Sequence, residues 1–234
     1  MDRFRVLDLA VDTKPDRTPV TEADRAVEAA LREQLGRARP GDAVIGEEEG
    51  EQGSGPRRWI VDPIDGTKSY LRGAPVWATL LALEDGGELV VGVASAPALG
   101  RRWWAARGSG AFANGELINV SRVHDLADAT LCFTDVGAFA LYGMWDEFVA
   151  LGSRVWDRRG FGDFWGHVLV AEGTADVMVE PIVNLWDVAP VLVIVEEAGG
   201  RVTDRSGRRT ADGGNAVTTN GLLHDAVLEI VGTS

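Results

Sequence analysis

Residues 59–70 read WIVDPIDGTKSY, in which a short apolar run ends at two aspartates three positions apart. Trp, Ile and Val are typical of covered strands, so the run predicts a buried strand. A carboxylate that leaves water is costly in free energy unless another group compensates its charge. Asp62 and Asp65 therefore indicate a site where this strand ends, and the fold must bring compensating groups to it.

The overall composition is that of a globular protein. The chain has 234 residues, of which 45% are hydrophobic and 25% charged. A chain of this length can bury roughly 70% of its unfolded surface, as one large domain or two closely packed subdomains. The formal net charge of −13 disfavours nucleic acid and anionic membranes as partners, because both carry the same sign of charge.

A single cysteine limits the redox chemistry of the chain. Cys132 has no second cysteine to pair with, and its apolar surroundings, TLCFT, favour a buried thiol over a nucleophile. The first residues lack the apolar core of a signal peptide, and no apolar run approaches the length of a membrane span. We therefore expect a cytoplasmic protein.

The order of the expected elements predicts an α/β fold of layered helices and sheets. The segment TPVTEADRAVEAALREQLG predicts a helix with a capping box formed by Thr21 and Asp24 and a stop at Gly36. Strand candidates then follow one another in the pattern of an antiparallel meander, and later short strands alternate with helices. We expect subdomains at 1–122 and 123–234, with the site in the cleft between them.

The residues that follow the buried strand indicate how the site is formed. The fixed φ of Pro63 predicts that the strand ends in a turn, and Gly66 and Thr67 can open a helix. Backbone N–H groups at a helix start can hold an anion such as phosphate. An anion site beside two acids, Asp62 and Asp65, implies cations between them.

Carboxylate ligands also limit the choice of metal. Oxygen ligands favour a hard ion, and Mg²⁺ is the usual one where phosphate oxygens and waters complete the coordination. His124, His167 and His224 are scattered along the chain in a way that predicts no zinc site. An isolated D-x-x-D pair is common in turns, so further motifs are needed to identify the site.

Three motifs together resemble those of the inositol monophosphatase family. WIVDPIDGTKSYLR resembles its first signature, WDVAPVLVIVEEAGG (186–200) its second, and IGEEE (45–49) is similar to its upstream acidic motif. Their order and spacing agree across nearly the whole chain. The resemblance implies the layered helices and sheets of sugar phosphatases, a Mg²⁺-dependent phosphomonoesterase and a homodimer.

The resemblance also implies a role for each matching position. Two or three Mg²⁺ would be bound by Glu47, Asp62, the carbonyl of Ile64, Asp65 and Asp187. Thr67 and Glu47 would orient the attacking water, Asp24 would hydrogen-bond Thr67, and Lys14 would lie in the loop that completes a third metal site. Two acids have simpler alternatives, because Asp24 fits a capping box and Asp187 fits a helix N-cap.

The segment GFGDFWGH indicates the substrate within the family. Bacterial histidinol-phosphate phosphatases carry a similar Gly-Asp step, so the resemblance implies L-histidinol phosphate as substrate, with Asp163 and Glu180 facing its ammonium group. The expected substrate-binding residues are Asp65, Gly66, Thr67, Asp163 and Glu180. Asp163 can instead cap the following helix. Two other functions stay open, an inositol- or sugar-phosphate phosphatase and a non-catalytic binder of phosphorylated metabolites.

Overall fold

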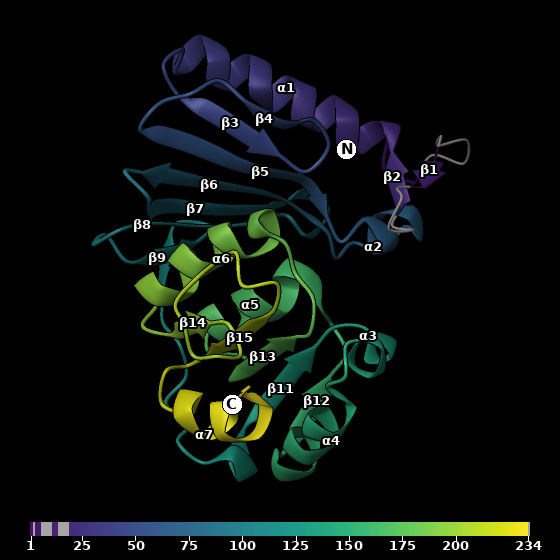
Figure 1. Cartoon of the computed structure of the whole chain (residues 1–234), viewed down its shortest axis with the longest axis vertical. Helices are drawn as coiled ribbons and strands as arrows, with labels where there is room; N and C mark the ends of the chain where they lie inside the picture. Colours follow the sequence, from purple (N-terminus) through teal and green to yellow (C-terminus); the bar gives the residue numbers. More distant parts are fainter. Residues whose placement is uncertain (2, 6–10, 14–18, 234) are drawn as a thin grey trace.

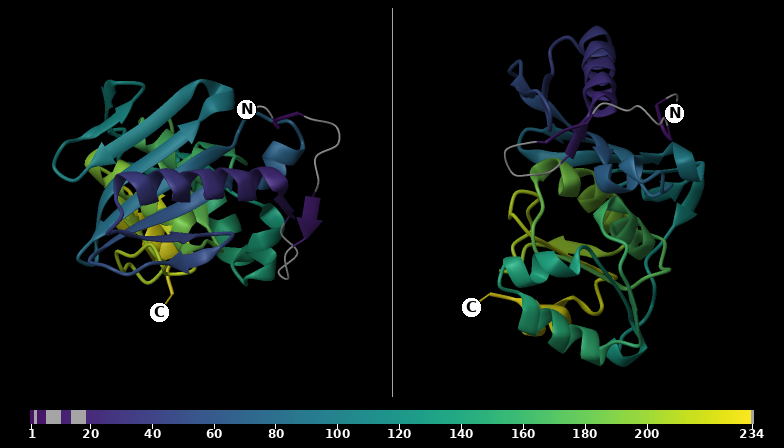
Figure 2. Two further views of the ribbon diagram at one scale, coloured as in Figure 1. Left: turned by 90° about the horizontal axis from the view of Figure 1, so that it is seen from above. Right: turned by 90° about the vertical axis from the view of Figure 1, so that its right-hand side faces the viewer.

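The computed structural model describes residues 1, 3–5, 11–13 and 19–233. Its layers alternate between helices and sheets, as expected for the predicted α/β class (Figure 1). α1 lies on the outer face of an eight-stranded sheet, α5 and α6 fill the space between this sheet and a five-stranded sheet, and α4 and α7 lie at the far side (Figures 1 and 2). Within the described residues, no helix is long and apolar enough to cross a membrane.

The helices occupy short stretches separated by the strands. Their bounds are α1 Glu22–Ala38, α2 Thr67–Leu71, α3 Val136–Leu141, α4 Trp145–Arg154, α5 Asp163–Ala171, α6 Leu185–Glu197 and α7 His224–Val231. Single-turn 3₁₀ helices lie at Pro97–Leu99 and Leu126–Asp128.

The strands form two large sheets and one small ribbon. The eight-stranded sheet has the order β10 (Glu116–Ile118), β9 (Ala111–Ala113), β8 (Arg101–Ala106), β7 (Glu88–Ala96), β6 (Ala78–Asp85), β5 (Arg57–Asp65), β3 (Ala43–Gly46) and β4 (Gly50–Gln52). The five-stranded sheet has the order β12 (Asp157–Arg159), β11 (Thr130–Phe133), β13 (Val177–Glu180), β15 (Ala216–Thr219) and β14 (Arg201–Thr203). The ribbon pairs β1 (Val11–Thr13) with β2 (Pro19–Thr21).

The register of the large sheet places the buried strand at its centre. β5 to β10 form the predicted antiparallel meander, whereas β3 pairs with β5 in parallel. Parallel pairing brings the carboxyl ends of β3 and β5 to the same edge. The acidic, Gly-rich segment after β3 turns back and pairs with β3 as the antiparallel strand β4.

α1 confirms the predicted capping box but not the predicted stop. The Thr21 side chain accepts hydrogen bonds from the amides of Ala23 and Asp24, and the Asp24 side chain accepts one from the Thr21 amide. The helix continues through Gly36 to Ala38, because an exposed glycine lowers helix propensity without ending a helix. Its buried residues are Ala23 and the two acids Asp24 and Glu28.

α6 is buried and packs on β7. The helix starts at Leu185, which places Pro190 in its second turn. The backbone approaches the sheet at Gly92, where an added Cβ would lie 2.1 Å from the Pro190 carbonyl oxygen. The main hydrophobic cluster contains residues from both sides of the predicted boundary at residue 122, and the division into two subdomains stays a prediction.

Candidate active site

Three carboxylates converge at the edge of the large sheet. Asp62 and Asp65 lie on β5 and Asp187 in the first turn of α6, and one oxygen from each lies within 4.8 Å of the others. Two carboxylates about 4 Å apart repel by about 4 kcal/mol at an effective dielectric near 20. The chain therefore places side by side three groups that only a cation or protonation can stabilise.

An irregularity in β5 explains how its two aspartates face one site. Side chains of a regular strand alternate between faces, so residues three positions apart would point in opposite directions. The pairing of β5 with β6 shifts register between Asp62 and Asp65, and the Thr79 hydroxyl donates to the Pro63 carbonyl within this irregularity, at 2.8 Å. The predicted turn at Pro63 is thus wrong. The strand continues to Asp65, because a bulge requires no ladder N–H at the proline.

Glu47 reaches the same edge from the neighbouring strand. It follows β3 directly, and its amide donates to the Val61 carbonyl at 3.2 Å, next to Asp62. Burial, and then the charge of Glu47 followed by that of Asp65, raise the pKa of Asp62 well above the usual range. The charge of Glu47 thus acts on Asp62, although the three carboxylates that lie within 4.8 Å of one another do not include Glu47.

Glu28 and Arg32 of α1 hold the loop that carries Glu47, and the sequence analysis missed both. The fully buried Glu28 carboxylate accepts from the amides of Glu48 and Glu49 at 2.8 and 3.1 Å, and from the Arg32 guanidinium at 2.7 and 2.9 Å. A Cβ at Gly46 would lie 2.2 Å from the Glu28 carboxylate, so only glycine fits there. Because Asp24, Glu28 and Arg32 recur every four residues, this polar stripe was the available signal.

The hydroxyl of Thr67 lies between its predicted partner Asp24 and the carbonyl of Ile64, which was predicted to bind metal. It donates to the Ile64 carbonyl at 3.0 Å and lies 3.5 Å from Asp24 Oδ1. The other oxygen of Asp24 accepts from the amide and hydroxyl of Thr21 at 2.8 and 2.5 Å. Asp24 therefore caps α1 and also faces Thr67, so both interpretations of this acid are consistent with the geometry. Lys14 lies outside the described residues.

Asp187 uses one oxygen within its own helix. Asn184 is the N-cap of α6, and its amide donates to Asp187 Oδ2 at 2.7 Å in a capping box. The alternative that Asp187 is itself the N-cap is therefore wrong. Burial is the main cause that raises the pKa of Asp187 to about 7; the Asn184 amide lowers this pKa, and the charges of Glu180 and Glu47 contribute to the rise.

Asp163 approaches the site from α5. Its Oδ2 lies 3.3 Å from the position that a Cβ on Gly66 would occupy, and its own φ is +56°. Asp163 does not cap α5, because the amide of Phe164 is bound at 2.7 Å by Oδ2 of Asp65, a residue of β5. The alternative that Asp163 caps its helix is thus wrong. Its carboxylate is directed toward Gly66, at the start of α2.

Glu180 completes the group of acids. It is buried at the end of β13, and His167 Nε2 lies 2.8 Å from its Oε2. Burial, and then the charge of Glu180, raise the pKa of Asp163 to about 6. Burial, and then the charge of Asp163, raise the pKa of Asp65 well above the usual range. Burial is the largest cause of both shifts, and the neighbouring carboxylates add to it, whereas the charge of Lys68 lowers the pKa of Asp163.

The donor set fits a hard divalent ion. Asp62 Oδ1 is buried and has no hydrogen-bond partner among the described residues, as expected of an oxygen that a cation would hold. The converging ligands are all oxygens, the type that Mg²⁺ prefers. Cys132 plays no part, because it is buried in the five-stranded sheet and burial raises the pKa of its thiol to about 11.

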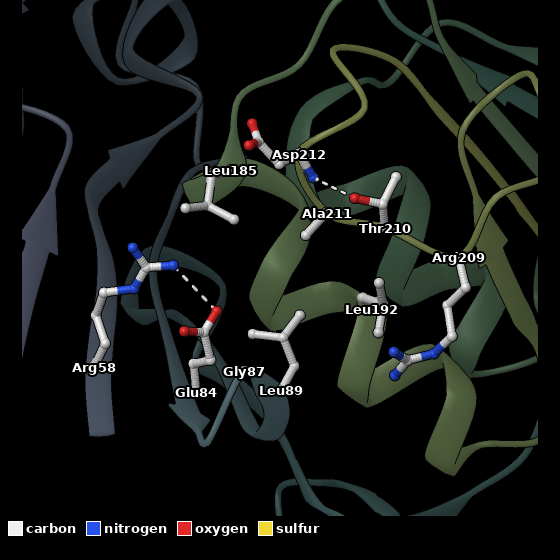
Figure 3. A pocket seen from close by; sticks show the side chains of 10 residues that line it. All are labelled: Arg58, Glu84, Gly87, Leu89, Leu185, Leu192, Arg209, Thr210, Ala211 and Asp212. Carbon is white, nitrogen blue, oxygen red and sulfur yellow. Dashed lines mark hydrogen bonds and ion pairs between the residues drawn. The ribbon is translucent and has the colours of Figure 1, made fainter. Parts of the chain in front are cut away.

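A separate pocket of about 280 Å³ lies beside the start of α6 (Figure 3). Arg58 and Glu84 line it from the sheet, and Leu185 and Leu192 from the helix. None of the predicted site residues lines this pocket. The site is therefore defined by its converging carboxylates, and the pocket is a different feature of the fold.

Comparisons with known proteins identify the family of this chain. The histidinol-phosphatases of Streptomyces coelicolor and Mycobacterium tuberculosis are 52% and 53% identical to this chain, each over 97% of it and 89% of the relative. An inositol monophosphatase of Thermotoga maritima superposes with a TM-score of 0.86 at 35% identity, over 95% of this chain and 87% of the other. The profile of the inositol monophosphatase family matches residues 1–233, and the chain belongs to this family.

Proposed function

We propose that this protein is a Mg²⁺-dependent phosphatase that hydrolyses a small phosphate monoester by direct attack of water. The convergence of Asp62, Asp65 and Asp187 within 4.8 Å, with Asp62 Oδ1 unpartnered among the described residues, is the observation that carries the proposal. This arrangement is unfavourable unless a divalent cation is present. Membership of the family supports the same activity.

The ligands of the metal follow from the family resemblance, and three of them are the converging carboxylates. Two or three Mg²⁺ would be held by Glu47, Asp62, the carbonyl of Ile64, Asp65 and Asp187. When bound, Mg²⁺ supplies Lewis-acid stabilisation of the phosphoryl oxygens and lowers the pKa of a coordinated water.

The chain itself positions the water and the phosphate. Thr67 and Glu47 orient the attacking water, and Asp24 orients the Thr67 hydroxyl. The backbone N–H groups of Gly66 and Thr67 hold the phosphate oxygens where negative charge develops. Water oxygen then bonds to phosphorus while the ester P–O bond breaks, and the alcohol leaves with a proton supplied by water. No covalent intermediate with the protein is needed.

L-histidinol phosphate is the proposed substrate. Two acids without a metal-ligand role, Asp163 and Glu180, lie beside the three carboxylates, and an ammonium group can donate a charge-assisted hydrogen bond to each of them. Relatives that are 52% and 53% identical are named histidinol-phosphatases. An inositol phosphate would offer only neutral hydroxyls to the same two acids.

Phosphate release tests the proposal directly. The protein, with Mg²⁺, is given L-histidinol phosphate, inositol-1-phosphate, fructose-1,6-bisphosphate or adenosine-3′,5′-bisphosphate, and Asp163→Asn is measured beside it. We expect a preference for histidinol phosphate that is lost in Asp163→Asn. Preference for another ester would retain the metal chemistry and change the substrate, whereas metal-dependent stabilisation without turnover of any ester would favour the non-catalytic binder.

We further propose a cytoplasmic homodimer. Leu141 and Tyr142 at the end of α3, with Trp145 and Val149 of α4, are large apolar side chains that remain exposed, which supports a second copy as the partner of this surface. Light scattering should give twice the mass of one chain. Trp145→Arg should lower that mass to one chain, and a monomeric wild-type protein would contradict the proposal.

A further inference from the structure

His167 is a fully enclosed histidine whose two ring nitrogens both have partners. It lies on α5 and is 1% exposed. Nε2 lies 2.8 Å from Glu180 Oε2 on β13, and Nδ1 lies 2.8 Å from the Thr218 hydroxyl on β15. The ring thus connects a helix to two neighbouring strands of the five-stranded sheet.

The chemistry of these partners fixes the direction of one hydrogen bond. An ionised carboxylate can only accept, so Nε2 carries the proton and donates to Glu180. The Thr218 hydroxyl donates to Nδ1 of the neutral ring or accepts from the protonated ring. In both protonation states Nε2–H therefore remains on Oε2. Within the described part of the chain, the hydrogen bonds of Glu180 go to this oxygen alone, which leaves Oε1 for the site.

The same helix carries the other acid that faces the substrate. Asp163 is the first residue of α5 and precedes His167 by four residues, and the charge of His167 acts on Asp163. The Asp163 carboxylate is directed toward Gly66, and the charge of Glu180 acts on Asp163. α5 thus carries Asp163 itself, and through the imidazole of His167 it also holds Glu180.

We propose that His167 is a positioning residue whose Nε2–H aims Glu180, together with Asp163, at the cationic part of the substrate. Thr218 fixes the ring plane and so the direction of that N–H. The inference rests on the proposed function, because it requires a phosphate ester that carries a positive charge. It predicts that the loss of this contact weakens binding of a cationic ester and spares a neutral one.

Two amide substitutions separate the two contacts of the ring. In His167→Gln, the side-chain amide nitrogen can reach the place of Nε2 and keep the donor to Glu180. In His167→Asn, the shorter amide can reach only the place of Nδ1, so the contact with Thr218 is kept and that with Glu180 is lost. The two variants are matched because both are neutral, planar and smaller than histidine.

The readout is the KM for L-histidinol phosphate against the KM for inositol-1-phosphate, with Mg²⁺ saturating and Tm measured on each variant. A hydrogen bond to a charged group changes affinity by about tenfold or more. His167→Asn should raise the KM for histidinol phosphate by about tenfold, change kcat by less than about twofold and leave the KM for inositol-1-phosphate unchanged. His167→Gln should stay within about threefold of wild type for both substrates, and Thr218→Val should fall between the two variants.

Several results would overturn this role. If His167→Asn keeps the substrate preference, or if it impairs both substrates equally while lowering Tm, the ring is only structural. If the glutamine and asparagine variants lose the preference equally, the donor to Glu180 is not the cause. Wild-type protein that turns over other esters but does not prefer histidinol phosphate would refute the proposed substrate and this role with it. The substrate preference of the wild-type protein thus distinguishes failure of the proposed substrate from failure of the proposed role of His167.

Discussion

Asp62 and Asp204 are both buried aspartates, 2% and 5% exposed, but their surroundings are opposite. The Asp204 carboxylate accepts from the amide and hydroxyl of Ser206 and from the amide and guanidinium of Arg208. Burial alone would raise the pKa of Asp204, but these hydrogen bonds outweigh it and the pKa lies below the usual value. Asp62 instead has one oxygen without a partner among the described residues and a pKa well above the usual range.

The difference shows what distinguishes a structural carboxylate from one that binds a cation. Both side chains are almost fully covered, but the Asp62 carboxylate lies deeper in the protein, and burial is the largest cause of its raised pKa. At Asp204 the chain itself supplies the donors, and the charge is stabilised when the protein folds. At Asp62 the chain supplies further acids, and the charge requires something that binds later.

The largest predicted effect separates the two aspartates by activity. Asp62→Asn should lower kcat by more than about 100-fold at saturating Mg²⁺, because the substitution removes a metal ligand. Asp204→Asn, the matched control, should stay within about twofold of wild type because it lies outside the site. Initial rates of phosphate release measure both variants, and near-normal turnover by Asp62→Asn would remove the proposed metal site.

Glu28 combines features of the structural carboxylate Asp204 and the proposed metal ligand Asp62. Its carboxylate is as fully bonded as that of Asp204, but its partners are the amides of the loop that follows Glu47. Glu28→Gln should weaken Mg²⁺ binding by about 10-fold or more, as substitutions behind metal ligands commonly do. Titration calorimetry with Mg²⁺ measures this without turnover. Glu33→Gln, on the exposed side of the same helix, is the control, and equal affinities in the two variants would contradict the role.

The two substitutions should affect stability in the opposite order to activity. Without metal, Asp204→Asn should lower the free energy of unfolding by about 1–3 kcal/mol, because donors of Ser206 and Arg208 lose an ionic acceptor. Asp62→Asn should leave it unchanged or raise it, because the substitution removes a repelled charge. Urea unfolding in EDTA gives both values. A loss of stability in Asp62→Asn equal to that in Asp204→Asn would mean that the two surroundings do not differ as described.

The smallest predicted effect is a pH dependence of the metal-free protein. The pKa of Asp187 is raised to about 7. A raised pKa contributes stability that is fully present below the unfolded value near 4 and lost as pH rises through about 7. The stability of the wild type relative to Asp187→Asn should therefore fall between pH 4 and 7. Saturating Mg²⁺ should abolish this slope, and a slope that persists with Mg²⁺ would have another origin.

The parts of the site that the sequence could predict are those encoded within one element. An apolar strand that ends at Asp65, and a helix start that carries Asp187, are local patterns, and the layered fold follows from the order of such patterns. The contacts of Glu28 and His167 join elements that are distant in sequence. In the sequence each of these two residues resembles an ordinary helix residue, because its partner comes near only when the elements pack together. The irregularity at Pro63 also depends on pairing with β6, which the sequence of β5 does not contain.

The hydrogen bond from the Phe164 amide to Asp65 Oδ2 has a thermodynamic consequence. This hydrogen bond joins α5 to β5. A carboxylate that is proposed to bind metal therefore also links the central helix layer to the eight-stranded sheet. A ligand that binds only the folded state stabilises it by about 2.7 kcal/mol at 100 times its dissociation constant. Binding of Mg²⁺ would therefore stabilise the packing of α5 against β5. The free energy of unfolding would rise with the concentration of Mg²⁺ in solution.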